Sequence, residues 1–183
     1  MKTKPFFTFL WRVTYSHTIA YWLAGVFAVT FMGYREHYAS DALSMLMLPV
    51  DNPLTALGPA LQIVRGAILA VVLWSFRSVI FGRGGYWKLA LLMFGLSQVC
   101  TIGPTPGSFD GLIYTVLPLF YHLLGLPEAL LYVGLFCGLL ALSYRIGRRY
   151  IDIIAAVCLL FVLFFGIMGW LALSGALPVP ATL

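Results

Sequence analysis

The sequence predicts an all-α integral membrane protein with five transmembrane helices, an inside N-terminus and an outside C-terminus. Three observations predict this class. Of the 183 residues, 62% are hydrophobic and 9% are charged, whereas a soluble domain carries about 25% charged residues. Several apolar segments are long enough for helices that cross a hydrocarbon core about 30 Å thick. No segment alternates apolar and polar residues as a membrane β-strand does.

Five apolar segments are expected to cross the membrane. Backbone groups in lipid must pair within their own segment, which predicts helices. The first segment is too long for the hydrophobic part of a signal peptide, and no cleavage site follows it, so we expect it to be retained. No internal repeat or domain boundary is visible, and residues 1–183 are expected to form one membrane domain. The predicted spans cover about 13–34, 56–81, 86–103, 129–146 and 151–174.

Basic residues predict how these segments are oriented. Positive charges stay mainly on the cytoplasmic side of a membrane, so the turns at 82–88 and 145–150 are expected inside and the loops at 35–55 and 104–128 outside. This pattern predicts a bacterial-type cytoplasmic (inner) membrane. The charges flank the segments rather than line one face, which predicts contact with membrane lipids and no nucleic-acid partner. Nine of the eleven basic residues form three clusters: Lys2/Lys4/Arg12, Arg77/Arg83/Lys88 and Arg145/Arg148/Arg149.

The two long outside loops are expected to carry further structure. Ser40 is suited to cap a short helix over 41–48. The segment 104–126 is expected to form a re-entrant or interfacial element on the outer side, because its apolar stretch at 112–125 is short and interrupted by Pro118. The alternative is a sixth span, which would move the third basic cluster outside.

Arg65 is the charge that needs a special explanation. It precedes Arg77 by 12 residues, about 18 Å of helix, so we expect it in the outer half of the membrane core. A charge there is costly unless it has partners or faces a wet cavity. The candidate ligand-binding residues are therefore Arg65 and the polar residues expected near it: Gln62, Gln98, Ser108, Asp110 and Glu36.

Two interpretations of this set stay open. Arg65 could be structural, forming an ion pair with Asp110 or Glu36. Alternatively, it could hold an anion below the segment GPTPGSFDG at 103–111, whose irregular backbone could form an anion-binding nest. Ser108 in that segment could instead cap the following helix.

The leading functional hypothesis is binding or transport of an anionic small molecule or lipid headgroup, by a homo-oligomer or a subunit of a larger membrane complex. Gly134 and Gly138 form a GxxxG pair that permits close helix contact. The paired broken helices of many transporters are not evident. No catalytic residue, cofactor or metal site is expected, because no nucleophile elbow or P-loop occurs and the three histidines lack metal spacing. His17 is expected to lie at the inner interface.

Two rival functions remain. One is an enzyme that acts on a lipid-linked substrate at the outer leaflet, with Asp110, Glu36 or Glu128 as acid or base. The other is a structural partner of another membrane protein.

Overall fold

The computed structural model describes residues 6–176. All regular structure among them is helical, so the all-α prediction is confirmed. Lys2 and Lys4 of the first basic cluster lie outside the described residues. The elements are α1 (Phe6–Phe31), α2 (Tyr34–Tyr38), α3 (Pro53–Ser75), α4 (Arg77–Ile80), α5 (Gly85–Phe94), the π turn η1 (Gly95–Val99), α6 (Phe109–Tyr114), α7 (Leu119–Leu124), α8 (Leu126–Ile146) and α9 (Arg149–Leu173).

Three helical segments of the described chain have the length and apolar composition to cross a membrane. They are α3, the run of α7 and α8 from Leu119 to Ile146, and α9. All three expose large apolar side chains, for example Ile68 on α3, Leu130 on α8 and Phe164 on α9. Soluble monomers rarely expose so much contiguous apolar surface. These helices indicate a membrane protein.

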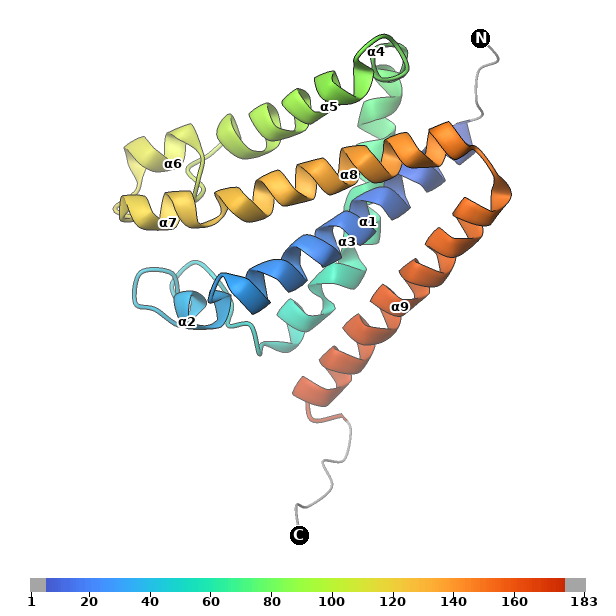
Figure 1. Ribbon diagram of the computed structural model, residues 1–183. Helices are drawn as coiled ribbons and strands as arrows, with labels where there is room; N and C mark the ends of the chain where they lie inside the picture. The colour runs from blue at the N-terminus through green and yellow to red at the C-terminus, as the bar shows by residue number, and fades with distance from the viewer. Residues whose placement is uncertain (1–5, 177–183) are drawn as a thin grey trace.

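The first helix, α1, lies at the centre of the bundle. It packs against α3, α8 and α9, while α5 packs against α8 (Figure 1). Protein therefore surrounds much of α1, and several polar side chains on it are buried. These are Arg12, Thr14, Ser16, His17 and Thr18.

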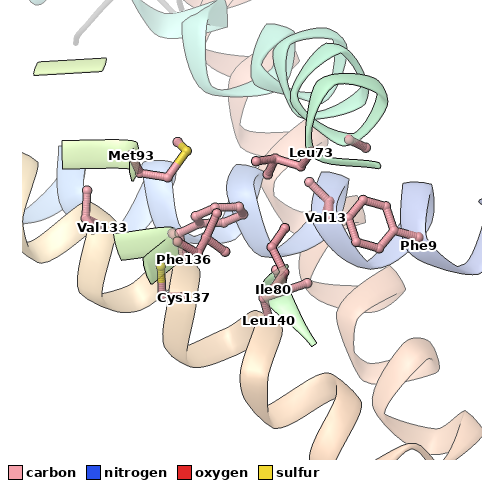
Figure 2. Close-up of a cluster of buried hydrophobic side chains, with 12 residues drawn as sticks. Phe9, Val13, Leu73, Ile80, Met93, Val133, Phe136, Cys137 and Leu140 are labelled. Atoms are coloured by element: carbon pink, nitrogen blue, oxygen red, sulfur yellow. The ribbon is translucent and has the colours of Figure 1, made fainter. Parts of the chain in front are cut away.

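An apolar core holds α1, α3, α5 and α8 together. Phe9 and Val13 of α1 meet Leu73 of α3 and Leu140 of α8, and Met93 of α5 lies at the other end of the cluster (Figure 2). Small residues bring helices closer elsewhere. A Cβ added at Gly166 of α9 would lie 3.0 Å from the Cβ of Ala60 in α3, so these two helices are in close contact.

The turns that carry the basic clusters meet at one end of the bundle. Arg12 at the start of α1 binds Asp152 at the start of α9 and the carbonyl of Ser143 near the end of α8. Phe81, just after α4, packs its ring 4.7 Å from that of Tyr144. The elements α2, α6 and α7 lie at the opposite end (Figure 1). Arg12 was expected to be a free flanking charge but is a buried partner in an ion pair.

The opposite end is built from short elements. The short helix expected over 41–48 is not formed; this segment is a series of turns whose first amides bond to the carbonyl of Ser40. The only helix in that loop is α2, which follows the left-handed Gly33 (φ 62°). In the second loop, α6 and α7 have six residues each, about 9 Å of helix. Neither is long enough to cross a membrane by itself, but α7 runs on into α8.

Candidate functional site

A cavity of about 310 Å³ lies at the end of the bundle where the short elements gather. It is partly open, and its walls are formed by α1, α2, α3, the end of α5, α7 and the start of α8, together with the turns near Leu43 and the loop at Pro106. This volume is at the lower end of the range for small-ligand pockets, roughly 300–1,000 Å³. Polar side chains from five α-helices and from the π turn η1 line it, which makes it the candidate site.

Arg65 contributes the positive charge of this cavity. It lies near the middle of α3, its side chain is exposed, and it is part of the cavity lining. It is close enough to Tyr21 on α1 and Tyr132 on α8 for its positive charge to act on both phenol groups. Within residues 6–176, Arg65 forms no hydrogen bond or ion pair with another side chain. Its donors are therefore available to a ligand.

Gln98 and Ser97 line the cavity from the π turn that ends the α5 segment. A π turn changes the direction of the side chains that follow it, and such turns are frequent at functional sites. The loop at 104–108 lies against Gln98, because a Cβ added at Gly107 (φ 81°) would be 2.5 Å from the Gln98 Nε2 atom. Arg65, Gln98 and the Pro106 loop thus share one cavity.

Glu128 contributes a negative charge to the same cavity from the first turn of α8. Its Oε2 accepts a hydrogen bond of 2.6 Å from the hydroxyl of Tyr34 on α2. The rings of Tyr34 and Tyr38 lie 5.0 Å apart. Burial, with Glu128 nearby, raises the pKa of both phenols above their usual value. Both hydroxyls are therefore neutral donors at physiological pH.

Gln62 does not line the cavity but lies behind its wall. Its Oε1 is 3.1 Å from His17 Nε2, and His17 Nδ1 is 2.7 Å from the hydroxyl of Tyr132. His17 has no exposed surface, so the expectation that it lies at an interface is wrong. The sequence suggested the interface because His17 is close to the N-terminal basic cluster, whereas α1 is covered by other helices at this level.

Ser108 has a structural role. Its side chain is fully buried; its Oγ accepts a hydrogen bond of 2.9 Å from the Gly111 amide and donates one of 2.8 Å to the Thr105 carbonyl. Ser108 therefore caps α6, as the alternative interpretation of this loop proposed.

The two carboxylates expected near Arg65 lie elsewhere. Asp110 borders a separate hollow with Cys100 and Thr101. Glu36 is exposed, with its Oε2 next to Gly33. Among the described residues, neither forms an ion pair with Arg65.

Sequence reasoning missed the tyrosines of the cavity. Five of the ten tyrosines in the chain line it: Tyr21, Tyr34, Tyr38, Tyr121 and Tyr132. Tyr34 is the last residue of the first predicted span, a position typical of an aromatic residue at the membrane interface. A signal was present, since Tyr34 and Tyr38 are one helical turn apart where the first span meets the outside loop, but the partner helices could not be identified from spacing alone.

The fold and the cavity together indicate a helical membrane protein with a pocket of mixed polar and apolar lining at one end of its bundle. Comparison with known proteins adds no relative: no family model, no curated protein and no solved structure matches the chain.

Proposed function

We propose that the protein binds an anionic small molecule or a lipid headgroup in this cavity and that Arg65 holds the anionic group. The observation that carries the proposal is the free guanidinium of Arg65 in a polar cavity, without a carboxylate partner in the described chain. A guanidinium presents its donors in a planar fork that matches the oxygens of a phosphate or carboxylate. Gln98 and Ser97 supply further polar groups to the same anion.

Energetics favour a ligand at this position. An arginine in the membrane core costs about 2.5–3.5 kcal/mol on insertion scales. Arg12 offsets such a cost with a carboxylate, a carbonyl and an aromatic ring. Arg65 has no comparable set of interaction partners within residues 6–176, so a bound anion would supply the missing stabilisation.

We further propose that α1, α3, the α5 segment with η1, α8 and α9 are five membrane spans in a bacterial-type cytoplasmic membrane. The N-terminus would be inside, the C-terminus outside, and α6 and α7 on the outer side. The meeting of the basic turns at the end of the bundle opposite the cavity supports this orientation. The cavity would then open toward the outer leaflet, where a lipid headgroup can reach it.

The test uses the purified full-length protein in a neutral detergent. Its thermal stability is measured with increasing dioctanoyl phosphatidylglycerol and, separately, inorganic phosphate. Binding raises the apparent stability by mass action, so a rising Tm is expected for the wild type. Arg65→Gln should weaken binding about tenfold or more, whereas Arg77→Gln should leave it unchanged. Arg77 is the matched control because it is an exposed arginine that stacks on Trp74, outside the cavity.

The two titrations together show which kind of ligand the cavity binds. Stabilisation by the lipid alone identifies a headgroup, and stabilisation by phosphate as well identifies a small anion. Arg65→Lys keeps the charge but loses the fork, and an intermediate affinity would support paired hydrogen bonds. Equal binding by wild type and Arg65→Gln would overturn the proposal.

A further inference from the structure

We propose that the ligand of this cavity is a zwitterion: a phosphate ester that also carries an ammonium group, as in a phosphoethanolamine headgroup. The phosphate would bind at Arg65, and the ammonium would bind at Glu128 and the tyrosines around it. This inference rests on the proposed function, because it assigns a second subsite to the same cavity.

The first argument is the separation of the two charges. Arg65 on α3 and Glu128 on α8 line one cavity, yet they form no ion pair with each other. Tyr21 of α1 lies within electrostatic reach of both. Opposite charges in a confined space attract strongly, because little water separates them. Two such charges held apart by different helices leave space for a ligand that carries the complementary pair.

The second argument is the surroundings of Glu128. Its side chain is half-buried, and within the described chain its one hydrogen bond comes from Tyr34. That bond is donated by a neutral phenol, so the negative charge of the carboxylate is not compensated by a cation from the protein. A partly buried carboxylate without a cation is costly. An ammonium group would provide the missing charge.

The third argument is the aromatic content of this side of the cavity. The rings of Tyr34 and Tyr38 lie side by side at 5.0 Å, and Tyr21 also lines the wall near Glu128. Ring faces attract ammonium groups, by about 0.5–2 kcal/mol for each contact. The faces of such rings do not attract a phosphate. An anion alone would leave this half of the cavity unmatched.

The choice of phosphate follows from the donors at the other end. Arg65, Gln98 and Ser97 can donate several hydrogen bonds to one group. A phosphate has several oxygens that can accept them. A volume of about 310 Å³ suits a headgroup without its acyl chains.

The experiment compares two lipids that differ only in the headgroup: dioctanoyl phosphatidylethanolamine and dioctanoyl phosphatidylglycerol. Their affinities for the full-length protein are measured by titration calorimetry in neutral detergent. The wild type should bind the ethanolamine lipid about tenfold more tightly. Glu128→Gln should remove this preference, because it should weaken the binding of the ethanolamine lipid only. Glu36→Gln is the matched control, because Glu36 is an exposed carboxylate outside the cavity.

Arg65→Gln distinguishes this inference from the proposed function. Suppose that Arg65→Gln weakens the binding of both lipids and that Glu128→Gln changes the binding of neither. The anion site is then supported and the ammonium site is overturned. If Arg65→Gln changes neither lipid, the proposed function itself fails. Tyr38→Leu provides a second variant that keeps the carboxylate; it should also reduce the preference, and an unchanged preference in both Glu128→Gln and Tyr38→Leu would contradict the inference.

Glycerophosphoethanolamine identifies the source of the ligand. It carries the same two charges without acyl chains. Binding comparable to that of the lipid would support a soluble zwitterion as the ligand, and much weaker binding would support a membrane lipid. Either result supports the ammonium site, provided that Glu128→Gln removes the binding preference.

Discussion

Arg12 of α1 and Asp152 of α9 form a bidentate ion pair that joins two helices far apart in the sequence. The Nε–Oδ1 distance is 3.1 Å and the Nη2–Oδ2 distance is 3.0 Å. The remaining nitrogen, Nη1, donates to the carbonyl of Ser143 at 2.9 Å, and the guanidinium lies 4.8 Å from the ring centre of Tyr144. One side chain therefore holds α1, α8 and α9 together.

We expect Asp152→Asn to destabilise the fold. The Arg12 side chain is 6% exposed and that of Asp152 is 26% exposed, so removing the carboxylate leaves a buried guanidinium without its counter-charge. The expected loss is about 3 kcal/mol in the free energy of unfolding, measured by denaturant titration in mixed micelles.

The matched control for this change is Asp51→Asn. Asp51 pairs with Arg35, and their side chains are 60% and 56% exposed. Such an exposed pair contributes at most about 1 kcal/mol. If both variants changed stability equally, the buried pair of Arg12 and Asp152 would not be what holds the three helices together.

Gly66→Val should separate α1 from α3. A Cβ at Gly66 would lie 3.0 Å from the Cα of Thr14 and 3.1 Å from its carbonyl oxygen, and backbone atoms cannot easily move away. The expected cost is about 2–3 kcal/mol of overpacking, measured as a fall in Tm. Gly25→Val on α1 is the control, since a Cβ there meets nothing within 4 Å. A larger loss at Gly25 than at Gly66 would refute this contact.

The His17 ring should carry its proton on Nε2. The Gln62 Oε1 at 3.1 Å can accept only from a protonated Nε2, and the Tyr132 hydroxyl at 2.7 Å then donates to Nδ1. The ¹⁵N chemical shifts of selectively labelled histidine report this tautomer directly, and His17→Gln assigns the signal. An Nδ1–H tautomer would mean that the hydrogen bonds run in the opposite direction.

Ser108→Ala should loosen α6 without affecting the spanning helices. The Ser108 Oγ bonds to the amide of Gly111 and to the carbonyl of Thr105, and losing an N-cap costs about 1 kcal/mol. Hydrogen exchange should become faster at the amides of residues 109–114 and stay unchanged in α3. Ser174→Ala, an exposed serine after α9, is the control. Unchanged exchange in α6 would show that the cap is dispensable.

The long helices could be predicted from the sequence because each depends on local composition. The expected segment 129–146 matches α8 at its end, which is fixed by the left-handed Gly147 (φ 64°). The segment 86–103 was extended too far, since the helix ends in a π turn at Val99. Apolar content does not distinguish a regular helix from one that changes its hydrogen-bond spacing.

The candidate site was only partly predictable. Arg65 was identified because a single charge in an apolar segment is visible in the sequence. Gln98 was identified because the depth of a residue in the membrane core can be estimated by counting residues along its helix. Glu128 entered only as an acid or base for a rival function, because its neighbours Tyr34 and Tyr21 come from other helices. Contacts between distant segments depend on helix rotation, which one sequence does not specify.

The central position of α1 has a consequence for biosynthesis. Among the described helices α1 is synthesised first, and Asp152 is synthesised 140 residues after Arg12. Until then, its charge has no carboxylate partner at that depth, and we expect α1 to enter the lipid only partly. Ribosome-bound chains that end before α3 should therefore be extractable by alkaline carbonate, unlike the finished chain. Firm anchoring of the shorter chains would mean that α1 is inserted without its later partners, and the assembly of this protein would not depend on its last helix.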